Sequence, residues 1–273
     1  MDYLAREGAP ISAALWQKID DIVIGEARKH MVCRRFLDIY GPLGAGATHV
    51  PVESTEVDEV YEHNMARVVG RPLAELPMLY QDFPILWRAI AEADSTGRPL
   101  DLSAAATAAQ RSAKQEDDLI LFGNKHLGVE GLFTAEKAKK MPRGDWSTGE
   151  AAFQDVAHAI AYMSSSSMLG RYTLILSPDV YLQLQRLQPN VGLLEIDRIK
   201  SLVGDRVYPV GTFGLGKAAL VCAEPQYMDL AVGMDLAAGY LEQKDFNHFF
   251  RIAETVALRI KNPKAIVQFE LQK

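Results

Sequence analysis

The sequence has little of what usually marks a secreted, membrane-embedded or disulfide-rich protein. Its 273 residues include only two cysteines, Cys33 and Cys222, which cannot build a disulfide framework and favour a reducing compartment. No apolar run approaches the roughly 18 uncharged residues of a membrane span. The first residues lack the basic-then-apolar order of a signal peptide. We therefore expect a soluble, cytoplasmic protein with no membrane partner.

An excess of basic charge is missing as well. The chain carries 29 lysines and arginines against 35 aspartates and glutamates, a net charge of −6. A mildly acidic chain is poorly suited to bind nucleic-acid phosphates, so no nucleic-acid partner is expected. The apolar share of 48% is that of an ordinary globular protein, and the length suits one large domain or two interleaved ones.

Motifs for catalysis and metal binding are also absent. No two of the six histidines share the i, i+4 spacing of a helical zinc site, and no Cys-x-x-Cys pair occurs. The run Gly41-x-x-Gly44-x-Gly46 lacks the Gly-Lys-Ser/Thr ending of a phosphate loop, and the serines at 164–167 do not form a Gly-x-Ser-x-Gly elbow. The sequence therefore predicts neither a catalytic nor a metal site.

Hydrophobic periodicity predicts helices in the first two thirds of the chain. Ser12 is a candidate N-cap for an amphipathic helix over 12–31, and Ser103 for an alanine-rich helix that stops at Gly123. At 1.5 Å per residue the alanine-rich helix is a spine of about 30 Å. Shorter helices are predicted at 83–93, at 147–163 (with Ser147 and Glu150 as a capping box), at 179–187 and at 194–202.

Residues 47–80 lack a helical stripe, are punctuated by prolines and mix valines with acidic residues. We expect a long extended arm with little core of its own, which lies on a neighbouring molecule. The last third of the chain is rich in strands, so the predicted class is α+β. The predicted strands are residues 172–176, 206–210, 218–222, 230–232, 237–241, 249–260 and 265–271.

Two features have more than one interpretation. Glu116, Asp117 and Asp118 follow one another on the spine helix and therefore cannot all converge on one metal, so a solvated or intersubunit face is expected. Trp87 on a short helix is most often core or interface packing, but an exposed indole can also stack on a flavin. No cofactor is required by the sequence, and a flavin at Trp87 is the one alternative left open.

A series of short motifs runs along nearly the whole chain. The motifs are Pro10-Ile11-Ser12 with Trp16, Arg34-Arg35-Phe36-Leu37-Asp38-Ile39 with Gly41-Pro42, Trp87-Arg88, Leu100-Asp101-Leu102-Ser103, Gln115-Glu116-Asp117-Asp118-Leu119-Ile120, Phe122-Gly123, Gly128-Val129-Glu130-Gly131-Leu132, Leu176-Ser177-Pro178, Met234-Asp235-Leu236 and Arg259-Ile260-Lys261-Asn262-Pro263-Lys264-Ala265-Ile266. In this order they resemble the encapsulin (linocin-like) nanocompartment shell proteins, family 1.

The resemblance implies the tailed-phage major-capsid fold of the Hong Kong 97 type. Its parts would be residues 1–46 as N-terminal helix and start of the peripheral domain, 47–80 as E-loop, 81–134 as peripheral domain with the spine helix, 135–225 as axial domain, and 226–273 as the return to the peripheral domain. It also implies a self-assembling icosahedral shell of roughly 60 copies or a multiple. The cargo would be a ferritin-like iron-storage protein or a dye-decolorising peroxidase with a C-terminal targeting peptide.

The resemblance also implies a cargo-peptide site. Arg34 and Asp38 match cargo-contact positions of the family, and they would anchor a peptide by charged hydrogen bonds. The apolar groove would be formed by Val23, Ala27, Met31 and Leu230. The alternative is that Arg34 and Asp38 pair with each other or with nearby backbone and only hold the fold. A pore loop is expected at Gln188, Pro189, Asn190, Val191 and Gly192.

Two other functions compete with a nanocompartment shell. A phage or prophage capsid protein would share the fold, but the net charge of −6 fits DNA packaging poorly. An enzyme with an unrecognised site, a hydrolase or flavoprotein, is disfavoured by the missing motifs. The sequence therefore favours a shell protein without catalytic activity.

Overall fold

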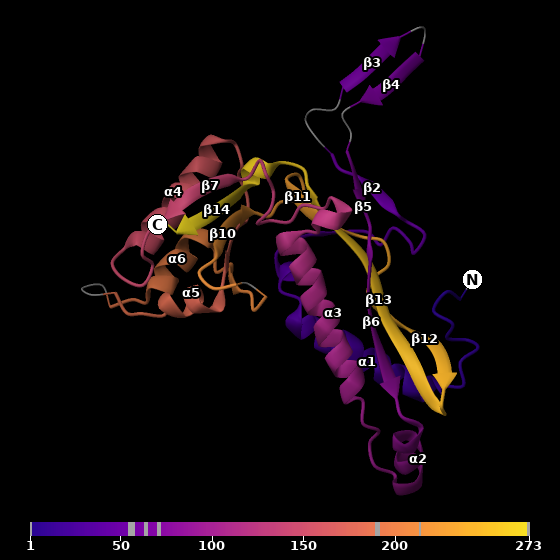
Figure 1. Cartoon of the computed structure of the whole chain (residues 1–273). Coiled ribbons are helices and arrows are strands. Elements are labelled where there is room, and N and C mark those ends of the chain that lie inside the picture. The colour runs from indigo at the N-terminus through magenta and orange to yellow at the C-terminus, as the bar shows by residue number, and fades with distance from the viewer. Residues whose placement is uncertain are drawn as a thin grey trace.

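The computed structural model describes residues 2–53, 58–62, 65–69, 72–188, 192–212 and 214–271. Figure 1 shows two lobes side by side and a hairpin that projects from the first lobe. The N-terminus lies on the first lobe and the C-terminus on the second. The chain is therefore an extended, two-lobed subunit with an arm.

The first lobe is a twisted sheet with helices on one face. Strand β13 (Asn247–Ile260) pairs along one edge with β6 (Met78–Ile85). Along its other edge it pairs with β12 (Ala237–Lys244) and then β11 (Met228–Val232), which carries the short parallel strand β1 (Ile39–Tyr40). The helices and turns of this lobe are α1 (Ala13–His30), η1 (Cys33–Arg35), α2 (Trp87–Thr96), α3 (Ser103–Phe122) and η2 (Lys125–Leu127).

Helices α1 and α3 pack together because each presents a small or apolar stripe to the other. Trp16, Ile19, Val23 and Ala27 of α1 are buried in one cluster with the alanines of α3 and with Phe83 and Phe250 of the sheet. The predicted N-cap is confirmed, since the Ser12 hydroxyl accepts a hydrogen bond from the Leu15 N–H at 3.2 Å. The predicted spine is confirmed as α3, which ends at Gly123, but the N-cap predicted at Ser103 is wrong because Leu102 holds that position and Ser103 is the first helical residue.

The arm is a hairpin with almost no core of its own. At its base β2 (His49–Pro51) pairs with β5 (Leu73–Glu75), and farther out β3 (Asp58–Glu62) pairs with β4 (Met65–Val69). The base is anchored through Val50 and Leu76, which pack on Ala231 of β11 and Ala257 of β13. Strand β6 already begins at Met78, within the range expected for the arm, because it pairs with β13 from that residue onward.

The second lobe is a sheet in the order β7-β14-β10-β8-β9. Its elements are β7 (Lys139–Arg143), α4 (Ala151–Ser165), β8 (Tyr172–Leu176), α5 (Pro178–Gln183), α6 (Glu195–Val203), β9 (Val207–Pro209), β10 (Ala218–Cys222), η3 (Pro263–Ala265) and β14 (Ile266–Leu271). Strand β14 thus differs from the expected division of the chain, in which 226–273 returns to the first lobe. Its buried residues pair with β10 and β7 in the centre of the second sheet.

Two predicted helices begin elsewhere. The helix expected at 83–93 starts at Trp87, because alternate residues of β6, including Phe83, point into the core. The helix expected from Ser147 starts at Ala151. The Ser147 N–H and hydroxyl instead donate to the Asp145 carboxylate, at 2.9 and 2.6 Å, so the capping-box interpretation is wrong.

Candidate functional site

The residues predicted to form an apolar groove are buried inside the chain. Val23, Ala27 and Met31 are only 1%, 2% and 5% exposed, because α3 covers this stripe of α1. Leu230 of β11 is 0% exposed and belongs to a different core cluster. The predicted groove is therefore absent at these residues, and these four side chains are not accessible to a peptide in this chain.

Arg34 lies at the centre of a charge cluster that joins η1, α3 and β13. Its Nε donates to both carboxylate oxygens of Glu116 at 2.9 Å, and its Nη2 donates to Glu116 Oε2 at 2.6 Å. Nη2 also donates to Glu254 Oε2 at 2.8 Å, and Nη1 donates to Asp235 Oδ1 at 2.7 Å. The Glu116 and Glu254 side chains are fully buried, whereas that of Asp235 is 64% exposed. One guanidinium thus serves two buried carboxyl groups.

Asp117 fastens the same turn to the spine helix. Its two carboxylate oxygens accept the N–H groups of Val32 and Cys33, each at 2.9 Å. Burial raises the pKa of Asp117 to about 6, although these two hydrogen bonds oppose the rise. A solvated or intersubunit face at Glu116 and Asp117 is therefore a wrong prediction, since both side chains are buried against η1.

Asp38 connects the two lobes. Its carboxylate accepts a hydrogen bond from Nη2 of Arg171, which precedes β8, and the Arg171 Nε donates to Glu224 at 3.1 Å. Phe36 stacks on Tyr208 of the second lobe with 5.9 Å between ring centroids. Within the described part of the chain, the Arg34 and Asp38 side chains therefore pair neither with each other nor, as expected in the alternative, with nearby backbone; both pair with side chains far away in the sequence.

An exposed surface lies beside these buried groups. Ile24 and Arg28 stand one turn apart on α1 and are exposed, and Arg28 lies near Asp235, the outer partner of Arg34. Ile39 is 51% exposed although its register partner Leu230 is buried. The sequence did not point to Ile24 of α1 or Ile39 of β1, because the apolar stripe of α1 was the predicted binding face, whereas that stripe is core.

The predicted pore loop is described only at its two ends. Gln188 is buried, and its Nε2 donates to the Gly149 carbonyl and to Glu195 Oε2, each at 2.6 Å. Gly192 has φ +73°, which favours glycine. Pro189, Asn190 and Val191 lie outside the described residues. Gln188 thus anchors the base of the loop and does not line an opening.

Trp87 is at the start of α2 and is 41% exposed. Its ring packs against Phe246 in a T-shaped arrangement with 6.1 Å between centroids, and the Arg88 guanidinium lies 5.1 Å from the Trp87 ring centroid. Phe246 is itself exposed and has φ +66°, an uncommon backbone conformation for a bulky residue. Flavin stacking on Trp87 stays a prediction.

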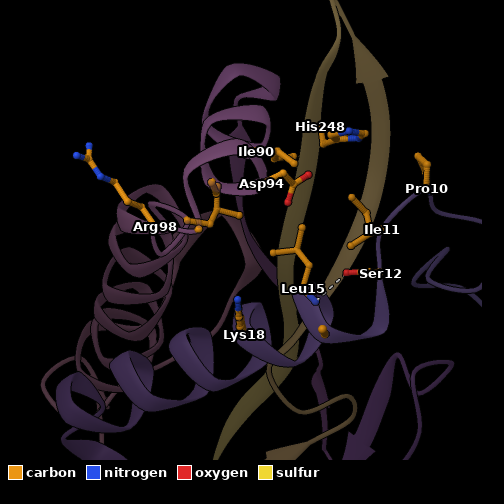
Figure 2. A pocket seen from close by; sticks show the side chains of 13 residues that line it. Pro10, Ile11, Ser12, Leu15, Lys18, Ile90, Asp94, Arg98 and His248 are labelled. Atoms are coloured by element: carbon orange, nitrogen blue, oxygen red, sulfur yellow. Dashed lines mark hydrogen bonds between the residues drawn. The ribbon is translucent and has the colours of Figure 1, made fainter.

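A cavity of about 520 Å³ opens between α1, α2 and the start of β13 (Figure 2). Leu15 and Ile90 supply apolar walls, while the polar side chains that line it are Ser12, Lys18, Asp94, Arg98 and His248. Burial lowers the pKa of His248, so this imidazole is neutral near pH 7. Within the described part of the chain no three His, Cys, Asp or Glu side chains cluster as metal ligands, and no helix is both long and apolar enough to span a membrane.

Comparisons with known proteins agree on one family. A family model described as encapsulating protein for peroxidase matches residues 1–257. The type 1 encapsulin shell protein EncA of Myxococcus xanthus is 40% identical over 98% of this chain and 96% of its own length. A diheme-cytochrome–encapsulin shell fusion protein of Kuenenia stuttgartiensis is 36% identical over 93% of this chain and 72% of its own length.

Solved structures with the same fold are shells and capsids. The virus-like particle of Pyrococcus furiosus has a TM-score of 0.75 at 22% identity, covering 93% of this chain and 99% of the other. The capsid of Myoviridae phage XM1 has a TM-score of 0.65 at 12% identity, covering 88% and 91%. The fold is therefore that of tailed-phage capsid proteins of the Hong Kong 97 type.

Proposed function

Because the chain belongs to the encapsulin family of shell proteins, we propose that it closes into an icosahedral shell that holds a cargo enzyme in the cytoplasm. The structural feature that carries this proposal is the arm, whose described outer residues Tyr61 and Met65 are 73% and 71% exposed. An isolated two-stranded hairpin is barely stable in water, so the arm needs a neighbouring copy. Many identical contacts of this kind close a symmetric particle.

The cargo would dock on the exposed surface around Ile24, Arg28, Asp235 and Ile39. This surface lies beside Arg34 and Asp38, the positions that match cargo contacts of the family. The exposed side chains of Ile24 and Ile39 supply apolar contact, while Arg28 and Asp235 supply charged hydrogen bonds to a short peptide. Arg34 then holds this surface in place through its hydrogen bond to Asp235, and Asp38 does so as the residue that precedes β1.

The test is cargo loading by a double variant, Ile24→Glu with Ile39→Glu. Burying an isoleucine contributes about 1.5–3 kcal/mol, and each 1.4 kcal/mol is a factor of ten in affinity. We expect intact shells with cargo reduced about tenfold or more, measured as the cargo-to-shell ratio after purification. Leu215→Glu, at an 85% exposed site in the second lobe, is the matched control. Wild-type loading by the double variant would exclude this surface.

The cargo is of the peroxidase or ferritin-like class, and the family description supports the first of these. Mass spectrometry of protein released from purified shells identifies it. Particles that contain DNA would instead support the phage-capsid alternative, and hydrolase or flavin-dependent activity of empty shells would support an enzyme.

A pore for ions and small molecules is assigned to the loop that follows Gln188. Its short, largely uncharged residues suit a narrow polar opening that selects by size. Inserting several glycines after Gly192 should speed the entry of a small probe into assembled shells without blocking assembly. The same insertion after Gly97, an exposed turn at the end of α2, is the control. Unchanged entry would count against the pore assignment.

A further inference from the structure

Two buried glutamates share one arginine behind the end of α1. Glu116 and Glu254 are both 0% exposed, and both accept hydrogen bonds from the same Nη2 of Arg34, at 2.6 and 2.8 Å. Two carboxylates this close cannot both be ionised beside a single cation without a large cost. Asp235 is a third carboxylate on the same guanidinium, since it accepts a hydrogen bond from Arg34 Nη1.

We propose that Glu254 holds a proton that it donates to Glu116, and that this proton is a latch that keeps η1 and the end of α1 docked on α3 and β13. The latch is a property of the folded chain and does not depend on which cargo is enclosed. Loss of this proton would free η1 and the end of α1, and the proposed cargo surface lies beside them.

The hydrogen-bond geometry assigns the proton to Glu254. Glu116 accepts three hydrogen bonds from Arg34, which satisfies both of its oxygens as a carboxylate. Glu254 accepts one, and its Oε1 is buried with no partner that could donate to it. A protonated Glu254 lies within hydrogen-bond reach of Glu116 and donates to it. Burial raises the pKa of Glu254 well above its ordinary value, and the Glu116 charge raises it further.

The charged groups around the latch come from α1, η1, α3 and the β11–β12 connection. They are Arg34 of η1, Glu116 and Asp117 of α3, Asp235 of the β11–β12 connection and, beside Asp235, Arg28 of α1. Beyond Asp117, Lys29, His30, Arg111 and Lys114 line an open cavity of about 480 Å³. Asp117 also releases its proton near pH 6, so Glu254 is best examined above that pH.

The sign of the pH effect follows from the raised pKa. In the closed state Glu254 is protonated, whereas in an opened state it is exposed and ionised. Opening therefore releases one proton and becomes about tenfold more favourable per pH unit until the raised pKa is passed. Latching is complete at low pH and is lost as the pH rises.

Cys33 reports this opening directly. Its thiol is 0% exposed within η1, and burial raises its pKa well above the ordinary value. Labelling by a thiol reagent is measured on the Cys33 peptide by mass spectrometry, from pH 6.5 upward, on assembled protein. Each labelling rate is divided by the thiolate fraction of a free thiol at that pH. The corrected rate is proportional to the fraction of molecules in which η1 is open.

Three isosteric variants separate the latch from simple damage. In Glu254→Gln the amide still donates to Glu116 but cannot ionise, so we expect slow labelling without the roughly tenfold rise per pH unit of the wild type. In Glu116→Gln the main carboxylate partner of Arg34 is lost, so labelling should be fast at every pH. Glu92→Gln, at a largely exposed site on α2, should follow the wild type.

A second readout is the infrared carbonyl band of a protonated carboxylic acid at neutral pH. We expect this band in the wild type and in Glu92→Gln, and we expect it to be lost in Glu254→Gln. A wild type without the band, equal pH slopes in the wild type and Glu254→Gln, or slow labelling in Glu116→Gln with fast labelling in Glu254→Gln would each overturn the proposal.

Discussion

Arg34 and Asp38 form ion pairs of very different character. The Arg34 side chain is 15% exposed and faces two fully buried glutamates, whereas Asp38 and Arg171 are 41% and 37% exposed. Breaking a buried pair leaves an uncompensated charge in the interior, but a pair that faces solvent is screened and contributes little. Removal of these two residues should therefore have unequal effects.

We predict that Arg34→Ala lowers the free energy of unfolding by about 3–5 kcal/mol, and that Asp38→Ala lowers it by about 0–1 kcal/mol. Denaturant unfolding of each single variant measures both values. Equal losses would show that the Arg34 cluster is no more buried in solution than the Asp38 pair. A combined variant is a poor test of cargo binding, because loss of Arg34 threatens the fold itself.

At the residue scale, the sequence identifies Arg34 and Asp38 as important, but it does not identify the partners that explain their role. Arg34 and Asp38 were singled out by resemblance, but their partners Glu116, Glu254 and Arg171 lie 82, 220 and 133 positions away. No local pattern identifies such partners. The stripe of α1 was correctly identified as apolar, yet periodicity alone does not say whether a stripe meets a peptide or, as here, α3.

Among the elements, the arm depends least on the rest of the chain. Its base is closed by the pairing of β2 with β5 and by a hydrogen bond from the Val52 N–H to the Pro72 carbonyl at 2.9 Å. Among the described residues, Val50 and Leu76 join the base to the core, and Lys261 pairs with Glu53 beside them. The two lobes therefore keep their packing if the outer hairpin is removed.

We predict that replacing residues 54–70 by a short glycine–serine linker leaves the subunit folded and abolishes shell formation. The ends of the deletion are already close at Val52 and Pro72, so the linker imposes no strain. Circular dichroism checks the fold, and light scattering after size-exclusion chromatography checks assembly. Wild-type particles formed by this variant would show that the arm is dispensable for closure.

The elements best predicted from sequence are those with local signals. Ser12 and Gly123 mark the ends of long helices, and the buried strands β8 and β10 lie where apolar runs predicted them. Strand β14 was assigned to the wrong lobe because its place is fixed by pairing with β10 and β7. Such pairing joins residues far apart in the sequence, which no local pattern records.

At the scale of the whole molecule, the two lobes share one hydrophobic core. A single core cluster runs through both and includes Leu37 and Leu230 of the first lobe and Leu174 and Leu220 of the second. The Phe36–Tyr208 stack and the Asp38–Arg171 pair reinforce the junction at its surface. A subunit whose lobes share a core and that carries a projecting arm suits a closed shell, in which identical contacts repeat between copies.

The central claim is closure into a shell, and electron microscopy of the purified protein at physiological salt tests it most directly. The account predicts closed icosahedral particles of roughly 60 copies or a multiple, with protein and not DNA inside. A stable monomer or small oligomer under the same conditions would contradict it.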